Sequence, residues 1–365
     1  MLGFLVKPKF NINFNDGAFV ECTKTRKPVT VNFYGEGKCI HSDIIQQDQW
    51  VRAFRSYYTK WNIECSLPNG HIVFRHQFSL ENMRVRVNID SKSLGDTIAW
   101  IPQIVEFARI HPSTIVHVSH FWPNLFDISG QENLKYVSPD NTVEDCYATY
   151  SIGYFFSDIE NRHPLDPRLQ PLGKVASDIL GLAYKERLPT MQKVSPNPIP
   201  NKPYICIATK STAECKHWLT ENGWQQVIDY IVSRGYDVYV IQKEQTQLRN
   251  IVDKTGDINI EDRIADLENC KFMIGLGSGL SWLAWALRKP VVLISGFSLP
   301  YAEFENNCYR VINQNVCHGC WNNTNYTFDR DDWNWCPLHK DTERAFECSK
   351  SISVDSVLSQ INKII

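Results

Sequence analysis

The chain has 365 residues, of which 43% are apolar and 21% are charged, and its formal net charge is -2. This composition is typical of a globular protein, and the length exceeds that of one ordinary domain. A charge so close to zero gives no general attraction to phosphate backbones or anionic lipid, so we expect neither nucleic acid nor a membrane surface to be the main ligand.

The N-terminal segment MLGFLVKPKF lacks the basic start, the long apolar centre and the small-residue cleavage site of a secretory signal. The most apolar stretch, residues 272–297, is interrupted by glycines, two basic residues and a proline, so we do not expect it to span a membrane. We therefore expect a cytoplasmic protein. In that reducing compartment, the twelve cysteines are expected to be buried thiols or metal ligands rather than disulfides.

The first part of the chain, residues 1–83, contains short alternating stretches that predict a β-rich module. Hairpin turns are predicted at residues 15–17 and 69–70, because Asn-Asp-Gly and Asn-Gly favour tight turns between strands. Residues 29–40 alternate between apolar and polar side chains like one half-buried strand.

From residue 84 the pattern changes to strand (84–89), helix (97–110) and strand (114–121). This order predicts a βαβ unit in a parallel sheet. Residues 158–203 are rich in proline and predict a connection that contains one short helix.

A second series of strands and helices follows in residues 204–296, and residues 353–365 predict a closing helix. Two Rossmann-like domains are therefore expected to face each other across a ligand-binding cleft. We divide the chain into the β-rich module (1–83), an acceptor-side domain with its linker (84–200) and a donor-binding domain (201–365).

Asp96 follows Gly95 where the first strand of the βαβ unit gives way to its helix. At the carboxyl edge of a sheet, this carboxylate is placed to accept a proton from a hydroxyl nucleophile, and the helix N-terminus favours its charged form. The alternative is that Asp96 only caps a helix that begins at Thr97.

The turn Gly277-Ser278-Gly279-Leu280 lies between an apolar strand and a helix. Free backbone N–H groups at such a helix start suit a diphosphate, and the glycines allow it to come close. Tight packing of a strand against a helix explains the turn equally well.

Thr209 and Lys216 follow the first strand of the second series. Lysine and hydroxyl groups at the carboxyl edge of a sheet can hold phosphate oxygens. The alternative is that they are ordinary solvated surface groups.

Four cysteines in the C-terminal part have the spacing of a metal site, since Cys317 and Cys320 form C-x2-C and Cys336 and Cys348 follow. Four thiolates predict a closed tetrahedral structural site in a finger at residues 308–348, for zinc by default, although iron accepts the same ligands. His318 and His339 lie close enough in sequence to be rival ligands, but we interpret them as bystanders, and Cys308 is a spare candidate.

The acidic triplet at residues 329–331, Asp-Arg-Asp, is like the one with which metal-dependent glycosyltransferases hold a divalent ion. It lies inside the cysteine-rich finger and not at the end of a strand, so we interpret it as a turn-forming cluster.

Three motifs occur in a specific order: Gly95-Asp96 after a strand, Lys216-His217-Trp218 after the first strand of the second domain, and Gly277-Ser278-Gly279-Leu280 before the last helix. In this order they resemble the two-domain heptosyltransferases that build lipopolysaccharide cores, although those enzymes usually have an acid where this chain has Gly277. SKSLGDTIAWIP, STAECKHW, GSGLSWLAWAL and CHGCWN are similar to the bacterial autotransporter heptosyltransferases, which attach heptose to serines of self-associating adhesins before export.

The resemblance implies an α/β GT-B glycosyltransferase fold, with a barrel-like N-terminal module that links subunits. It implies an inverting protein O-heptosyltransferase that moves heptose from ADP-heptose to serine hydroxyls of an autotransporter adhesin passenger domain. It further implies a structural iron ion, Fe3+, in the four-cysteine site, no divalent metal in catalysis, and a large homo-oligomer, a dodecameric ring.

Carried onto this sequence, the resemblance makes Asp96 the general base. Glu244, just past a strand of the second domain, is placed to contact the nucleotide ribose. The expected donor-binding residues are Thr209, Lys216, Glu244, Gly277, Ser278, Gly279 and Leu280. Two alternatives remain open, namely a GT-B heptosyltransferase with a lipopolysaccharide or other non-protein acceptor, and a non-enzymatic metal-finger docking protein.

Overall fold

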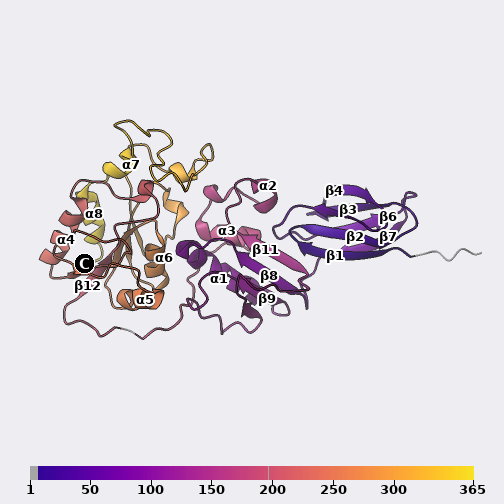
Figure 1. The fold of residues 1–365 in the computed structure, drawn as a ribbon, viewed down its shortest axis with the longest axis horizontal. Coiled ribbons are helices and arrows are strands. Elements are labelled where there is room, and N and C mark those ends of the chain that lie inside the picture. Colours follow the sequence, from indigo (N-terminus) through magenta and orange to yellow (C-terminus); the bar gives the residue numbers. More distant parts are fainter. Residues whose placement is uncertain (1–6, 196) are drawn as a thin grey trace, which may run out of the picture.

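The computed structural model describes residues 7–195 and 197–365, so most of the N-terminal segment that was judged not to be a secretory signal lies outside the described residues. Figure 1 shows three lobes in a row, which we call the β lobe, the central lobe and the C-terminal lobe in chain order. Among the described residues, none of the helices combines the length and the hydropathy that crossing a bilayer requires.

The β lobe is built from short strands, as the sequence predicted, and several of them alternate buried and more exposed side chains. Two sheets face each other (Figure 1). The strands are β1 (Lys9–Asn15), β2 (Ala18–Lys24), β3 (Val29–Gly35), β4 (Lys38–Ile45), β5 (Gln49–Ala53), β6 (Asn62–Ser66) and β7 (Ile72–Gln77). Phe14 of β1 packs edge to face against Phe78, the residue directly after Gln77.

The predicted turns at residues 15–17 and 69–70 are confirmed, since they join β1 to β2 and β6 to β7. The prediction of one strand over residues 29–40 is wrong. Glu36 and Gly37 take positive φ angles of 48° and 78°, so the chain turns back there and forms the hairpin of β3 and β4.

The central lobe has a sheet in the order β10-β9-β8-β11-β1-β2-β5, so three strands of the β lobe continue it. The pairs from β10 to β1 are parallel, whereas β1-β2 and β2-β5 are antiparallel. The new strands are β8 (Arg84–Ile89), β9 (Ile115–Ser119), β10 (Leu134–Tyr136) and β11 (Ala148–Ile152).

The C-terminal lobe has a six-stranded sheet in the order β14-β13-β12-β15-β16-β17, and all of its strand pairs are parallel. Every residue of β12, β15 and β16 is buried, which explains their nearly continuous apolar sequences. The strands are β12 (Tyr204–Ile207), β13 (Asp237–Val240), β14 (Val252–Asp253), β15 (Met273–Leu276), β16 (Val291–Ile294) and β17 (Cys308–Val311).

Helices cover these sheets, and several 3-10 turns lie in the loops. The helices are α1 (Leu94–Ile110), α2 (Ile159–Arg162), α3 (Leu172–Ile179), α4 (Gly223–Ser233), α5 (Ile260–Glu268), α6 (Gly279–Ala286), α7 (Glu347–Lys350) and α8 (Val354–Ile361). The 3-10 turns are η1 (Pro167–Leu169), η2 (Glu214–Lys216), η3 (Pro300–Ala302) and η4 (Cys320–Asn322).

The central and C-terminal lobes meet where the start of α1 packs against the start of α6. A Cβ atom on Gly95 would lie 2.8 Å from Cδ1 of Trp282, and a Cβ atom on Gly279 would lie 3.0 Å from Cβ of Leu94. Each helix therefore has a glycine in its first turn at the point where the other helix touches it. These two glycines allow the helix N-termini to come into contact.

We expect Gly95→Ala to separate the two helix starts, because its methyl group would overlap Trp282, which is only 6% exposed. Overpacking of this kind costs about 1–3 kcal/mol. Urea denaturation should show this loss in the free energy of unfolding. The control is Gly130→Ala, since nothing lies within 4 Å of a Cβ atom there. Equal stability of the two variants would contradict the account.

Candidate functional site

The predicted site residues follow the strands at which each sheet reverses its order. Parallel α/β sheets bind ligands beyond the carboxyl ends of such strands. In the central sheet the reversal lies between β8 and β11, which are followed by Asp96 and Tyr154. In the C-terminal sheet it lies between β12 and β15, which are followed by Lys216 and Ser278. The contact of α1 with α6 brings these two strand edges together.

Asp96 lies in the first turn of α1 and is 8% exposed. Its Oδ2 accepts a hydrogen bond from the Ser91 hydroxyl at 2.5 Å, and its Oδ1 accepts one from the Tyr154 hydroxyl at 3.2 Å. Helix α1 begins at Leu94 and is capped by Ser93, whose side chain accepts from the N–H of Asp96. The alternative in which Asp96 caps a helix beginning at Thr97 is therefore wrong.

Burial raises the pKa of the Asp96 carboxyl above its ordinary value. The hydrogen bond from Ser91, the charge of Lys216, the hydrogen bond from Tyr154 and the charge of Arg330 lower this pKa again. Burial also raises the pKa of the Tyr154 phenol, and Asp96 adds to that shift, so the phenol stays protonated and donates. A buried carboxylate with a raised pKa and fixed donors is typical of a general base.

Lys216 ends the 3-10 turn η2, and its Nζ lies 5.7 Å from the centre of the Phe297 ring. Trp333 also contacts this loop. The N–H of Glu214 donates to the carbonyl oxygen of Trp333 at 3.3 Å, and the ring of His217 meets the indole of Trp333 edge to face. The position of the Lys216 ammonium group therefore depends on residues near the predicted cysteine site.

Thr209 and Glu244 lie further along the same edge of the C-terminal sheet. The N–H and the hydroxyl of Thr209 both donate to Oε1 of Gln242, at 2.6 and 2.8 Å, and this ties the end of β12 to the end of β13. Glu244 is exposed, and its carbonyl oxygen accepts from Nε2 of Gln242 at 3.0 Å. Gln242 was not predicted, because its role depends on the pairing of β12 with β13.

Ser278 is the N-cap residue of α6, but its side chain makes no capping hydrogen bond. Its Oγ is buried and has no partner among the residues that the structure describes. The turn is fixed instead by Ser281, whose hydroxyl donates to the carbonyl of Leu276 at 2.7 Å. A buried hydroxyl without a partner costs free energy, so the turn is suited to a ligand that accepts from Ser278 and from the free N–H groups of the first helical turn.

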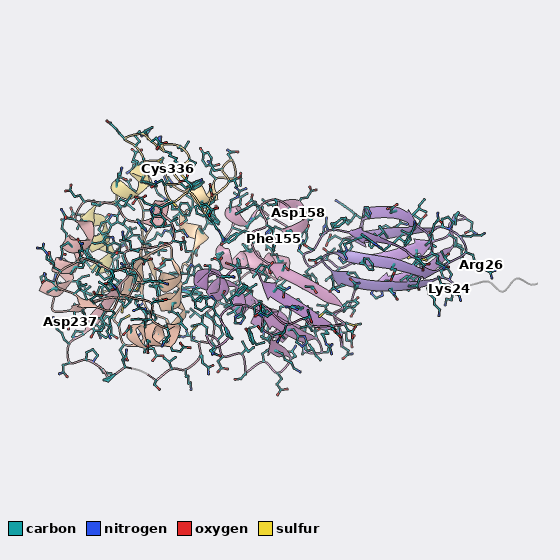
Figure 2. All side chains as sticks on the ribbon, viewed as in Figure 1. Lys24, Arg26, Phe155, Asp158, Asp237 and Cys336 are labelled. Atoms are coloured by element: carbon teal, nitrogen blue, oxygen red, sulfur yellow. The ribbon has the colours of Figure 1, made fainter. Side chains whose placement is uncertain are left out.

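The four predicted cysteine ligands lie in the segment 308–348, which we call the cysteine segment, and the other three thiols are close enough to Cys348 to raise its pKa; Figure 2 labels Cys336 there. Burial, with a smaller contribution from the neighbouring thiols, raises the pKa of Cys320 to about 11 and that of Cys348 to about 12. A bound cation would offset this repulsion between thiolates, so the cluster fits a thiolate-bound metal.

Among the described residues, no three of the four predicted thiols lie within 4.8 Å of one another, and the group of ligand atoms that does so shares only Cys317 with the predicted set. One ligand atom each from Cys317, His339 and Glu347 lie within 4.8 Å of one another. His339 was considered as a rival ligand and Glu347 was not. Glu347 also pairs with Arg344 at 2.7 Å, so its carboxylate already has a cationic partner.

The cysteine segment also contacts the central lobe near Asp96. The ring of Trp321 meets the ring of Tyr154 edge to face at 5.4 Å, and Nδ2 of Asn322 donates to the carbonyl of Arg168 at 2.6 Å. Arg330, which the sequence placed in a turn cluster, is exposed and close enough to lower the pKa of Asp96. Local sequence gives no signal for these contacts, because they join residues far apart in the chain.

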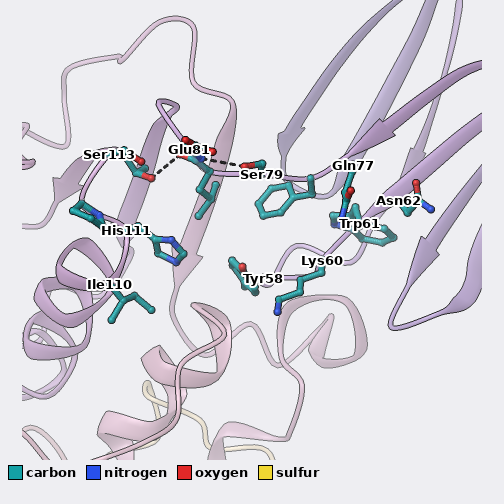
Figure 3. A pocket seen from close by; sticks show the side chains of 14 residues that line it. Tyr58, Lys60, Trp61, Asn62, Gln77, Ser79, Glu81, Ile110, His111 and Ser113 are labelled. Atoms are coloured by element: carbon teal, nitrogen blue, oxygen red, sulfur yellow. Dashed lines mark hydrogen bonds between the residues drawn. The ribbon is translucent and has the colours of Figure 1, made fainter.

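A cavity of about 470 Å³ lies between the β lobe and the central lobe, and Figure 3 shows its lining, which includes Tyr58, Lys60 and His111. His111 follows the last residue of α1, whereas Asp96 lies in its first turn. The length of the helix, at 1.5 Å per residue, separates the cavity from Asp96 by about 20 Å. The cavity is therefore distinct from the predicted site.

Sequence comparisons connect this geometry with known proteins. Residues 173–317 match the model of glycosyltransferase family 9 (heptosyltransferase). Autotransporter heptosyltransferase Aah of Escherichia coli is 35% identical over 364 residues, which cover 96% of this chain and 92% of Aah. Another relative, named the inactive autotransporter heptosyltransferase BimC of Burkholderia thailandensis, is 29% identical over 86% of this chain and 76% of its own length.

The fold also matches a solved relative closely. The crystal structure of the dodecameric iron-containing heptosyltransferase TibC in complex with ADP-D-beta-D-heptose superposes with a TM-score of 0.89, covering 97% of this chain and 95% of that one at 31% identity. TibC is an autotransporter heptosyltransferase of Escherichia coli O78:H11. The chain described here therefore belongs to the autotransporter heptosyltransferases, which are glycosyltransferases with the family 9 heptosyltransferase fold.

Proposed function

We propose that this protein transfers heptose from ADP-heptose to serine hydroxyl groups of an autotransporter adhesin passenger domain, with inversion at the anomeric carbon. The observation that carries the proposal is the contact of α1 with α6, which brings the buried Asp96 next to the turn at Ser278. The ADP-heptose complex of TibC supports the donor, and the names of the relatives support an autotransporter as the acceptor.

In the proposed mechanism, Asp96 is the general base. Its carboxylate takes the proton of the serine hydroxyl while the serine oxygen bonds to the anomeric carbon and the bond from that carbon to the phosphate oxygen breaks. The serine attacks from the side opposite to the diphosphate, so the configuration inverts. Ser91 and Tyr154 support this role because their hydrogen bonds fix both carboxylate oxygens.

The C-terminal lobe holds the donor in this proposal. The diphosphate lies on the N–H groups of Gly279 and Leu280 and accepts from the Ser278 hydroxyl, while the Lys216 ammonium group offsets the charge of the departing ADP. These groups take the part that a divalent ion plays in other glycosyltransferases. Gly277 allows close approach and Glu244 contacts the ribose.

Thr209 has an indirect part in donor binding. Both of its donors are used by Gln242, so we propose that it shapes the edge of the sheet beside the donor and leaves only its oxygen lone pair free for the ligand.

The proposed architecture is the GT-B arrangement, with a β-rich module (1–83), an acceptor-side domain with its linker (84–200) and a donor-binding domain (201–365). The strand order of the C-terminal sheet and of the parallel part of the central sheet supports two Rossmann-like halves. We also propose a dodecameric ring linked through the β lobe, as TibC is described as dodecameric. Three large apolar side chains are exposed on the β lobe and suit such contacts: Ile44, Trp50 and Phe54.

We propose that the four cysteines hold a structural Fe3+, with zinc as the alternative. The ligand type suits either ion, and TibC is described as iron-containing. When bound, the ion supplies positive charge that keeps the thiolates together and orders the cysteine segment. This segment then holds the Lys216 loop through Trp333 and packs Trp321 on Tyr154.

One relative is named as inactive, so heptose transfer must be measured for this chain itself. The variant Asp96→Asn then tests whether Asp96 is the general base. The amide cannot accept the serine proton, so we expect transfer to fall about 100- to 10,000-fold while ADP-heptose affinity is kept. Mass spectrometry of a co-purified adhesin passenger domain measures heptose on serine. Asp140→Asn, at an exposed carboxyl of the same lobe, is the control. Wild-type transfer by Asp96→Asn would remove the general base from the proposal.

The pH dependence of transfer tests whether the hydrogen bond from Ser91 lowers the pKa of the Asp96 carboxyl. Ser91→Ala removes a hydrogen bond that lowers the pKa of Asp96, so this pKa rises. The base must be ionised, and therefore the acid limb of the kcat/KM profile is expected to move to higher pH. Ser129→Ala removes a similar serine-to-aspartate bond of 2.6 Å, made by the exposed Ser129 to Asp127, and should leave the profile unchanged. An acid limb that stays or moves down would contradict this.

The metal proposal is tested by replacing Cys317 and Cys320 together with serine. We expect the bound metal to fall from about one ion per chain to almost none, because a hydroxyl is a poor ligand for these ions. The thermal unfolding midpoint should fall as well, since a structural metal contributes to folding. Elemental analysis and calorimetry measure both. Cys39→Ser, at an exposed cysteine of the β lobe, should keep the metal. Metal retained by the double variant would show that other residues bind it.

A further inference from the structure

Glu303 is a second carboxylate beside the α6 turn, and the mechanism above does not use it. It follows η3, and its side chain is 11% exposed. A Cβ atom on Gly277 would lie 2.8 Å from Oε1 of Glu303, so the carboxylate contacts the residue directly before Ser278. Glu303 is also close enough to Tyr154 of the central lobe to raise the pKa of that phenol. It therefore lies between the α6 turn and the residue that holds Asp96.

Two side chains fix the Glu303 carboxylate. Nη1 of Arg310, on β17, donates to Oε2 at 2.5 Å, and the hydroxyl of Ser298 donates to Oε1 at 2.6 Å. Nη2 of Arg310 also donates to the carbonyl of Ser298 at 2.8 Å, so the three residues form one unit. Each carboxylate oxygen can accept a further hydrogen bond. The carboxylate is therefore oriented without being saturated.

The surroundings of this unit contain polar atoms without partners. Oγ of Ser278 and Nε of Arg310 are both buried, and neither has a hydrogen-bond partner in the part of the chain that the structure describes. Buried polar atoms in folded proteins nearly always have a partner. The proposed diphosphate accounts for the Ser278 hydroxyl, but it leaves Nε of Arg310, in the unit that holds Glu303, without a partner. The unpaired atoms indicate a polar ligand at this position.

We propose that the Glu303 carboxylate, held by Arg310 and Ser298, accepts hydrogen bonds from hydroxyl groups of the donor sugar and so favours the sugar nucleotide over the bare nucleotide. This inference rests on the proposed function, because it needs the diphosphate on the turn at Ser278. A sugar attached to that diphosphate and facing Asp96 passes Gly277. Hydrogen bonds from hydroxyl groups to a carboxylate are charge-assisted and stronger than neutral ones.

The experiment compares ADP with ADP-heptose as ligands of the full chain by isothermal titration calorimetry. Glu303→Gln keeps the shape of the side chain and removes its charge. We expect the Kd for ADP-heptose to rise about tenfold or more, which is the effect of weakening a hydrogen bond to a charged group, while the Kd for ADP stays within about twofold. Glu305→Gln, which removes an exposed carboxylate two residues away, should change neither Kd.

Glu303→Gln also removes the ion pair with Arg310 and could therefore change the position of Arg310. A second variant tests the proposal while keeping this ion pair. Ser298→Ala removes the hydroxyl that donates to Oε1 of Glu303, so this end of the carboxylate is free to turn while the ion pair with Arg310 is kept. The charges are kept and only the carboxylate moves. The same selective loss of ADP-heptose affinity is expected from this variant.

Measuring both ADP and ADP-heptose distinguishes failure of the proposed function from failure of the inference about Glu303. A wild-type chain that binds neither ADP nor ADP-heptose would overturn the proposed function and this inference together. If the wild type binds both, and both variants change the two affinities equally or not at all, Glu303 is only a structural partner of Arg310. In that case the proposed function still stands.

Discussion

The contact between the first turns of α1 and α6 is the constraint on which the rest of the structure depends. Gly95 and Gly279 remove the side chains that would hold the two helices apart. Because a helix N-terminus carries free N–H groups and partial positive charge, their meeting creates a region that favours anions. The buried carboxylate of Asp96 and the proposed diphosphate site at Ser278 both use this region, one from each lobe.

The cysteine segment connects the parts of this region that belong to different lobes. Trp333 holds the Lys216 loop in the C-terminal lobe, while Trp321 packs on Tyr154, which holds Asp96 in the central lobe. A metal bound by the cysteines would therefore act on transfer without touching the substrate. In the proposed function, such a metal would have a structural role beside the site of transfer.

The sequence predicted the elements whose signals are local, and it missed what depends on tertiary contacts. The alternating and helical patterns located β8, α1, β12 and α6, and the turn residues located two hairpins. The predicted start of α1 was three residues too late, because Ser93, and not Asp96, caps the helix. Tyr154, Arg330 and Glu303 gave no local signal. Tyr154 follows β11, which pairs with β8 where the strand order of the sheet reverses. This position could have been predicted from the strand order, but no sequence motif indicates which strands pair.

The central claim is that the diphosphate lies on the turn at Ser278, with Asp96 beside the sugar it carries. A crystal structure of the chain with ADP-heptose tests this most directly. The account predicts phosphate oxygens at hydrogen-bond distance from the N–H groups of Gly279 and Leu280, with the Asp96 carboxylate facing the anomeric carbon from the side opposite the diphosphate. A diphosphate bound elsewhere, or an Asp96 carboxylate that points away from the sugar, would contradict it.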